Sequence, residues 1–169
     1  MPPSGPISAW EKALRVLSAR ACSEAELTSR LLRAGYPPDE TAAAVRECAK
    51  RRYLDDALLA EDCAAMWRDR GHGTRSIRYK LRQRGIPDEI AATALAETVE
   101  NEETAVLNAV NSKLPSLMRE SDPRKRKAKA LRFLAARGFS GDAIRTALKH
   151  INAAVAARND GASNSTYSD

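Results

Sequence analysis

The sequence has few of the features that mark an enzyme site, a metal centre or a membrane span. Aromatic residues make up 5% of the 169 residues, and no apolar run reaches the roughly 18 residues of a membrane-spanning helix. The three cysteines, Cys22, Cys48 and Cys63, lack Cys-x-x-Cys spacing, and neither His72 nor His150 stands at ligand spacing to them. We therefore expect reduced thiols, no metal ion, no cofactor and no membrane partner.

Neither end of the chain has the pattern of a folded segment. Residues 1–6 are rich in proline and lack the apolar segment of a secretory signal, so we expect a flexible N-terminus and a cytoplasmic protein. Residues 158–169 are dominated by small polar residues, and we expect a disordered tail there. The folded part of the chain is expected between these two ends.

The sequence contains one motif in three copies. Each copy places a leucine four residues before a glycine and an apolar residue directly after it. The glycines, Gly35, Gly85 and Gly138, are 50 and 53 residues apart, and a repeat of this length is typical of an array of one small unit. The copies read Leu31-Leu32-Arg33-Ala34-Gly35-Tyr36, Leu81-Arg82-Gln83-Arg84-Gly85-Ile86 and Leu134-Ala135-Ala136-Arg137-Gly138-Phe139.

The repeated glycine is typical of a helix C-terminus, where the backbone enters a left-handed conformation that glycine adopts without steric cost. In the Schellman motif, the residue after the glycine also contacts the residue that lies four positions before the glycine. All three copies have an apolar pair at these positions. We therefore predict three helix ends, with the structural residues Gly35, Gly85, Gly138, Leu31, Leu81 and Leu134.

Each predicted helix end has a matching helix start. Ser23 and Glu26 have the spacing of a capping box. Thr74 is in position to cap the equivalent helix of the second copy. Asp122 before Pro123 is typical of a helix that begins at a proline. The helix that ends at each glycine is thus bounded on both sides.

An amphipathic helix precedes each capped helix, and another helix follows each glycine. The preceding helices fall at residues 7–20, 55–70 and 102–119, and Pro115 is expected to kink or end the last one. No sustained alternation typical of a strand occurs. We predict an all-α fold of nine helices, in three tandem helix-turn-helix-like repeats that form an elongated, curved array. The repeats span residues 7–54, 55–101 and 102–157.

Positive charge is concentrated in two segments. The chain has a net charge of +6. Residues 64–84 carry seven Lys or Arg and one acid, and residues 119–137 carry eight and two, so each segment has +6. Residues 1–63 are near neutral at −1, and residues 85–118 carry −5. Both basic segments include the helix that ends at the repeated glycine.

Within each basic segment, three basic residues share a helix face. The face of the second repeat points away from Ile77 and Leu81, and that of the third is expected opposite Leu131 and Leu134. Such faces are often merely solvated, but two in corresponding helices favour a polyanion or an acidic partner. The candidates for electrostatic contact with a partner or DNA are Arg75, Arg78, Arg82, Lys125, Lys129 and Arg132.

Two further patterns have simpler interpretations than catalysis. Asp55 and Asp56 are better explained as a cap and a first-turn residue than as paired catalytic carboxylates, because no nucleophile or histidine accompanies them. His72 lies in a Gly-His-Gly loop. Those glycines precede a helix and suggest a weak phosphate cradle, but the lysine of a Walker motif is missing.

Short segments from about residue 9 to residue 151 have a characteristic order and spacing. They are Ala13-Leu14, Leu17-Ser18, Arg20, Ser23, Glu26-Leu27, Tyr53-Leu54-Asp55-Asp56, Ala60, Gly71-His72-Gly73, Ile77, Leu81, Arg84-Gly85-Ile86, Phe133-Leu134 and Arg137-Gly138-Phe139. In this order they resemble the RecX family, bacterial regulators of the RecA recombinase. The chain departs from the family pattern at Leu59, Thr74 and Ser76, where an aromatic, a proline and a basic residue are frequent.

The resemblance implies tandem three-helix units and a non-enzymatic modulator of RecA. Such a protein lies in the groove of a RecA filament on single-stranded DNA, limits filament growth, and restrains ATP hydrolysis, strand exchange and the SOS response. It needs no cofactor. Direct contact with DNA and contact only through RecA remain alternatives, as do capping of filament ends and coating of the groove. We expect a monomer, since no long heptad seam occurs.

A second hypothesis comes from the same helices. Short helices joined by a glycine turn, with arginines nearby, are also compatible with a helix-turn-helix regulator that binds a specific DNA sequence. Such a protein discriminates one duplex from others by a large factor. An enzyme of small-molecule metabolism finds no supporting set of residues.

Overall fold

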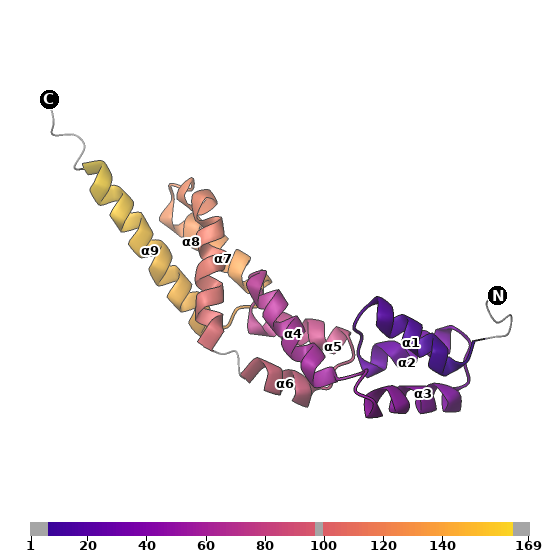
Figure 1. Cartoon of the computed structure of the whole chain (residues 1–169). Coiled ribbons are helices and arrows are strands. Elements are labelled where there is room, and N and C mark those ends of the chain that lie inside the picture. The colour runs from indigo at the N-terminus through magenta and orange to yellow at the C-terminus, as the bar shows by residue number, and fades with distance from the viewer. Residues whose placement is uncertain (1–6, 97–99, 164–169) are drawn as a thin grey trace. The chain divides into compact units, whose positions relative to one another are not determined.

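The computed structural model describes residues 7–96 and 100–163, and there it contains nine α-helices and no strand (Figure 1). This confirms the predicted all-α class. We call α1–α3 the first module, α4–α6 the second and α7–α9 the third. The helices are α1 (Ala9–Ala19), α2 (Glu24–Arg33), α3 (Pro38–Lys50), α4 (Asp56–Asp69), α5 (Thr74–Gln83), α6 (Asp88–Ala96), α7 (Glu100–Met118), α8 (Pro123–Ala136) and α9 (Gly141–Ser163).

The chain divides into two compact units. Unit 1 holds the first module together with residues up to Ala64 of α4 and the segment Arg78–Ala94. Unit 2 holds the segment Ala65–Ile77 together with the third module. The second module therefore contributes residues to both units. The elongated, curved arrangement of the repeats stays a prediction.

The three glycine stops have the predicted geometry. Gly35, Gly85 and Gly138 have φ angles of +91°, +74° and +74°. After each one, the next backbone N–H donates to the carbonyl of the leucine five residues back, at 3.2–3.3 Å. These are the long bonds of a Schellman motif. All three leucines are fully buried, so each stop is fixed by local hydrogen bonds and by the core beneath it.

Most predicted helix starts are confirmed. Ser23 and Glu26 form the full capping box of α2, and Asp122 accepts hydrogen bonds from the first turn of α8. Asp55 accepts the N–H groups of residues 57 and 58, so it caps α4 as predicted. The prediction for Thr74 is wrong. Thr74 is the first residue of α5, and its own N–H is capped by a distant side chain described below.

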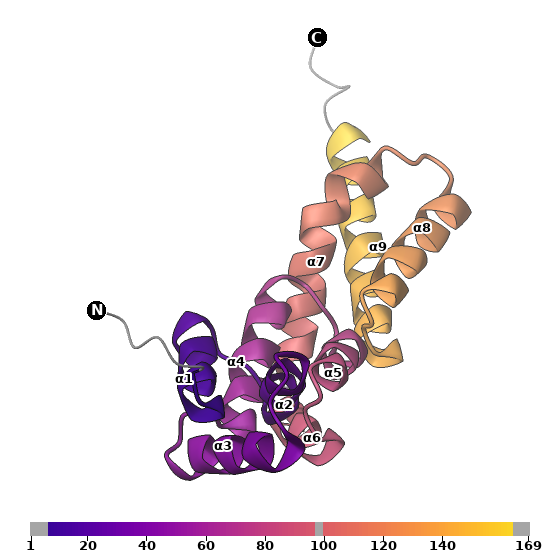
Figure 2. The ribbon, with the colours of Figure 1, turned by 90° about the vertical axis from the view of Figure 1, so that its right-hand side faces the viewer.

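Each unit has an apolar core built from the buried faces of its helices. In unit 1, α1, α2 and α3 pack together around fully buried residues that include Ala13, Leu27 and Leu31. In unit 2, α7, α8 and α9 lie side by side (Figure 2), and their core includes Val106 and Leu134. Small alanines recur in both cores, which allows close approach of short helices.

One helix of the third module has about its predicted extent, and another runs beyond it. α7 ends at Met118, close to the end of the predicted 102–119, so the helix does not end at Pro115, although proline has no N–H to donate back along the helix. The last helix continues to Ser163, beyond the predicted end of the repeat at residue 157 and into the first six residues of the predicted disordered tail. Residues 1–6 and 164–169 lie outside the described residues. Within the described part, no helix is both long and apolar enough to cross a membrane.

Candidate partner and nucleic-acid interface

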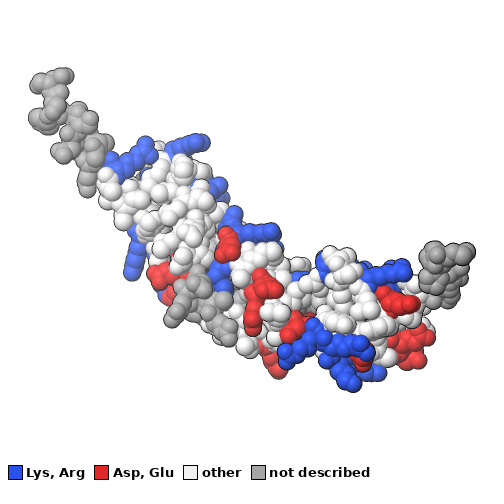
Figure 3. All heavy atoms as spheres, viewed as in Figure 1, with Lys and Arg blue, Asp and Glu red and all other residues white. Residues whose placement is uncertain are grey.

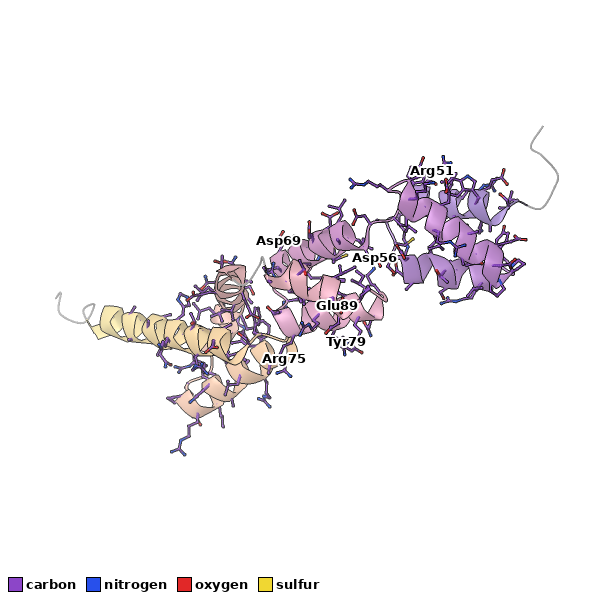
Figure 4. The ribbon with its side chains drawn as sticks, turned by 90° about the horizontal axis from the view of Figure 1, so that it is seen from below. Arg51, Asp56, Asp69, Arg75, Tyr79 and Glu89 are labelled. Atoms are coloured by element: carbon purple, nitrogen blue, oxygen red, sulfur yellow. The ribbon has the colours of Figure 1, made fainter. Side chains whose placement is uncertain are left out.

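The basic side chains predicted on α5 fall in two different units. Arg75 belongs to unit 2, where its backbone N–H donates to the carbonyl of Gly138 at 3.1 Å. Its side chain is exposed at the start of α5 (Figure 4). Arg78 and Arg82 belong to unit 1. The structure thus brings Arg78 and Arg82 together in one compact unit, whereas Arg75 belongs to the other.

Arg78 and Arg82 share one carboxylate. Arg78 Nε lies 3.6 Å and Arg82 Nη2 lies 3.3 Å from the same oxygen of Asp88, in the first turn of α6. All three side chains are exposed, so these ion pairs are weak and are easily exchanged for another anion. The charge of Arg78 and Arg82 is therefore partly neutralised by Asp88, but both side chains are available to bind another anion.

The basic residues of α8 differ in their surroundings. Lys125 and Arg132 are exposed, with no ion pair among the described residues. Lys129 is half-buried, and its ammonium donates to the carbonyl of Ser116 at 2.9 Å, which joins α8 to α7. Leu131 is 36% exposed, so the expectation that it marks the buried side is wrong. The buried face is instead centred on Ala130 and Leu134.

Within unit 1, the turn after α5 packs against the first module at a contact that we call the first joint. Arg84 donates to both carboxylate oxygens of Glu26, at 2.8 and 3.1 Å, and to the carbonyl of Ala21 at 3.2 Å. In return, the Ser23 hydroxyl donates to the Arg84 carbonyl. The Glu26 carboxylate raises the pKa of Arg84 further above its ordinary value. The arginine before the repeated glycine therefore connects the second module to the first.

Within unit 2, the turn after α8 packs against the loop between α4 and α5 at the equivalent contact, the second joint. Arg137 donates to the carbonyls of Arg70 and Gly71, both at 3.0 Å, and its guanidinium lies 4.8 Å from the centre of the Phe133 ring. The N–H of Gly73 donates to the Arg137 carbonyl at 2.8 Å. The arginine of the third copy thus has the same role as Arg84.

Each joint also contains a carboxylate that caps a helix of the preceding module. Asp56, at the start of α4 (Figure 4), accepts the N–H of Glu24 at 3.0 Å. Glu102 of α7 accepts the N–H of Thr74 at 2.9 Å and that of Ser140 at 3.3 Å, so it serves α5 and the start of α9 together. These acids occupy the positive ends of helix dipoles.

The carboxylates at the joints differ in proton affinity. Burial works to raise the pKa of Glu102, but backbone and side-chain hydrogen bonds from Thr74 and Ser140 outweigh it and lower the pKa below its ordinary value. The same holds for Glu26: burial works to raise its pKa, but the hydrogen bonds from Arg84 and Ser23 outweigh burial and lower the pKa. For Asp56, burial prevails and raises the pKa.

A basic hollow of about 360 Å³ lies beside the first joint, entirely in unit 1. Arg20, Arg30 and Arg33 line it together with the Glu26–Arg84 pair. The charge analysis missed these arginines because nearby acids, mostly on α3 and α4, cancel them in the segment total. On the face in Figure 3, side chains of both signs lie over α1 to α3. A signal was present, since Arg30 and Arg33 are one helical turn apart.

Other candidate chemistry is accounted for by structure. His72 is half-buried, and its Nδ1 lies 3.2 Å from the hydroxyl of Ser76. Cys22, Cys48 and Cys63 are buried free thiols, and burial raises the pKa of the first two. In the described part of the chain, no group of three or more His, Cys, Asp or Glu side chains is arranged to hold a metal ion.

Comparison with known proteins gives a consistent result. Residues 9–48 match the family model "RecX, first three-helix domain", residues 55–95 match the second such domain and residues 101–148 match the third. The chain is 36% identical over 140 residues to "Regulatory protein RecX" of Chromohalobacter salexigens, which covers 83% of this chain and 90% of that protein. It is 34% identical over 154 residues to the protein of the same name from Chlorobaculum tepidum, covering 90% and 94%.

A solved structure has the same fold. The crystal structure of RecX from Lactobacillus salivarius aligns with a TM-score of 0.78 at 20% sequence identity, covering 85% of this chain and 94% of that one. At this identity the likeness concerns the fold alone. Together with the family models, it confirms the prediction of three three-helix repeats.

Proposed function

The chain belongs to the RecX family of regulatory proteins, and we propose that it binds RecA filaments on single-stranded DNA and limits their growth, ATP hydrolysis and strand exchange. The observation that carries this proposal is the match of all three family domains in order along the chain. The family consists of regulatory proteins rather than enzymes, in agreement with the expectation from the sequence.

The proposed docking is electrostatic. The exposed guanidinium groups of Arg78 and Arg82 exchange their shared carboxylate for an anionic group of the filament. Arg75, Lys125 and Arg132 are exposed and offer further positive charge. Lys129 belongs to the same predicted set, but its bond to Ser116 gives it a structural role as well.

The test is the rate of ATP hydrolysis by purified RecA on single-stranded DNA. The variant Arg75→Ala/Arg78→Ala/Arg82→Ala is expected to keep its helicity and to inhibit several-fold less, with the deficit growing as salt is added. Lys125→Ala/Arg132→Ala is expected to have a smaller effect of the same kind. A folded triple variant that inhibits like the wild type removes these arginines from the mechanism.

Titration separates the two modes of inhibition. Inhibition at amounts far below that of RecA indicates capping of filament ends, whereas inhibition proportional to the added protein indicates coating of the groove. The alternative hypothesis of a sequence-specific regulator requires one duplex sequence to bind far more tightly than others. Equal binding of unrelated duplexes, together with tighter binding to RecA filaments, rejects that alternative.

A further inference from the structure

The hollow beside the first joint concentrates positive charge, because four arginines and a single carboxylate line it. It is formed by the end of α1, by α2 and by the turn after α5. Arg20, Arg30 and Arg33 line it, and no ion pair joins them to a carboxylate among the described residues. The one acid in the lining is Glu26, and both of its oxygens already accept hydrogen bonds from Arg84. An anion bound here would therefore meet three guanidinium groups without competition from that acid.

A second basic hollow adjoins the first. It has a volume of about 440 Å³, also lies in unit 1, and is lined by Lys12, Val16, Arg30, Arg33 and Ala34. Arg30 and Arg33 thus line both hollows. The result is a continuous basic strip across the α1–α2 surface, with two concave places separated by the same pair of arginines.

The chemistry of the lining favours phosphate over an acidic protein surface. Protein–protein interfaces usually have an apolar or aromatic centre, whereas the first hollow has no large apolar side chain in its lining. Interfaces with nucleic acids are more polar and more positively charged. Guanidinium groups bind phosphate oxygens in pairs of hydrogen bonds. Ser29 and Gln83 also line the hollow; the Ser29 hydroxyl accepts a hydrogen bond from Arg33 and keeps its own proton to donate, and the Gln83 amide donates to the Tyr79 hydroxyl and has a second N–H.

We propose that unit 1 binds the phosphodiester backbone of single-stranded nucleic acid directly, along the strip formed by Lys12, Arg20, Arg30 and Arg33. A flexible single strand can place successive phosphates in the two adjoining hollows, which share Arg30 and Arg33. No aromatic side chain lines either hollow, so there is no surface for base stacking and binding is independent of sequence. The inference deepens the proposed function by supplying a direct contact with DNA, but its test needs no RecA.

The experiment measures the fluorescence anisotropy of a labelled oligothymidylate against the full chain at several salt concentrations. The variant Arg30→Gln/Arg33→Gln is expected to bind about tenfold more weakly at low salt. Its plot of log affinity against log salt should be shallower by about 1.4, at about 0.7 for each lost phosphate contact on a single strand. Arg46→Gln/Lys50→Gln is the matched control, since both residues are exposed on α3, line neither hollow and remove the same charge.

Equal loss of affinity in both double variants overturns the proposal, because binding then follows net charge rather than this strip. Wild-type affinity in Arg30→Gln/Arg33→Gln also overturns it, provided circular dichroism shows a folded chain. Should that variant unfold, Arg30→Lys/Arg33→Lys keeps the charge, and a loss of affinity at unchanged salt slope supports paired guanidinium contacts. Preferential displacement of the oligonucleotide by polyglutamate indicates an acidic protein partner and rejects a nucleic-acid site.

The RecA reaction distinguishes the two proposals. A variant of the strip that loses affinity for the oligonucleotide but still inhibits RecA supports the strip and leaves the proposed function standing. A wild-type chain that binds the oligonucleotide at the strip but never inhibits RecA defeats the proposed function and leaves this inference intact.

Discussion

The two joints place the same residue in the same position but give it different partners. In both, the arginine before the repeated glycine donates to carbonyls of the loop between the first two helices of the preceding module. Arg84 also forms a two-bond ion pair with Glu26. Arg137 instead lies against its own Phe133 ring. The constant element is the main-chain acceptor, and the side-chain partner is free to vary.

The comparison explains why the first copy of the motif differs from the others. α1 is the first helix that the structure describes, and the first copy has Ala34 where the later copies have Arg84 and Arg137. A Cβ added to Gly35 would meet nothing within 4 Å, whereas one added to Gly85 or Gly138 would collide with the preceding module. The motif thus combines a local part, the helix stop, with a joint-forming part that only the later copies need.

Alanine at the three glycines should separate these two parts, and it is the largest effect that we predict. Gly35→Ala incurs only the strain of a left-handed residue, about 1 to 2 kcal/mol of unfolding free energy. Gly138→Ala adds a clash with Ser76, whose backbone N would lie 2.4 Å from the new Cβ, for a total of about 3 to 5 kcal/mol. Gly85→Ala should fall between, since there the close contact is the Ala25 methyl group.

Urea unfolding of the three glycine variants measures this order. Equal destabilisation at all three glycines would show that the joints tolerate displacement, and the distinction between local and joint-forming roles would then be lost.

Loss of the joint arginine is expected to be next in size. The side chains of Arg84 and Glu26 are 18% and 21% exposed, and Arg84→Met leaves a half-buried carboxylate without its partner, at a cost of about 2 to 3 kcal/mol. Arg137→Met removes bonds to two carbonyls and strands no charge, at about 1 to 2 kcal/mol. A double-mutant cycle with Glu26→Gln should give a clear coupling to Arg84. Glu26→Gln with Arg137→Met serves as the additive control.

The acids at the joints predict a pH dependence of smaller size. The pKa of Glu26 and that of Glu102 are lowered from an ordinary value of 4.5. Their stabilisation is therefore present above about pH 4.5 and is lost as pH falls through their folded pKa values. We expect Glu102→Gln to reduce the unfolding free energy by about 1 kcal/mol near pH 7.

Near pH 3 the difference between Glu102→Gln and the wild type should shrink, which urea unfolding at both pH values measures. A difference that persists unchanged in acid would mean that the charge of Glu102 is not what holds the two helix starts. The difference in unfolding free energy between Glu26→Gln and the wild type should shrink in acid in the same way. The pKa of Asp56 is raised, so ionisation of this carboxyl lowers the stability of the fold as pH rises.

The smallest predicted effect concerns the loop of the third module. Arg126, from α8 itself, donates to the carbonyls of Glu120 and Ser121 at 2.9–3.2 Å. The Glu120 carbonyl corresponds in its loop position to those of Ala21 and Gly71. Since this contact joins no two modules, Arg126→Ala should cost about 0.5 to 1 kcal/mol by thermal unfolding. A loss as large as that of Arg84→Met would place this loop on a par with the joints.

The helix stops and most helix starts could be predicted because they depend on near neighbours. The bond from Tyr36 back to Leu31 and the cap of Ser23 on Glu26 span five and three residues. Glycine, leucine and serine at those spacings therefore carry the whole signal. Family membership added the order of the modules, which no single stop contains.

The joints could not be predicted because their partners are far apart in the chain. Arg84 and Glu26 are 58 residues apart, and the cap on Thr74 comes from Glu102, 28 residues later. The same reason explains the role of Lys129, whose partner Ser116 lies on another helix. A sum of charge over a segment also hides a local cluster, as it did for Arg30 and Arg33 beside the acids of α3 and α4.

The occupied loop of the third module bears on attempts to lengthen this protein. The Glu120 carbonyl, at the loop position of Ala21 and Gly71, already accepts two bonds from Arg126. If a further module were added after α9, its joint arginine would compete with Arg126 for this carbonyl. An engineered four-unit chain would therefore be expected to gain from replacement of Arg126.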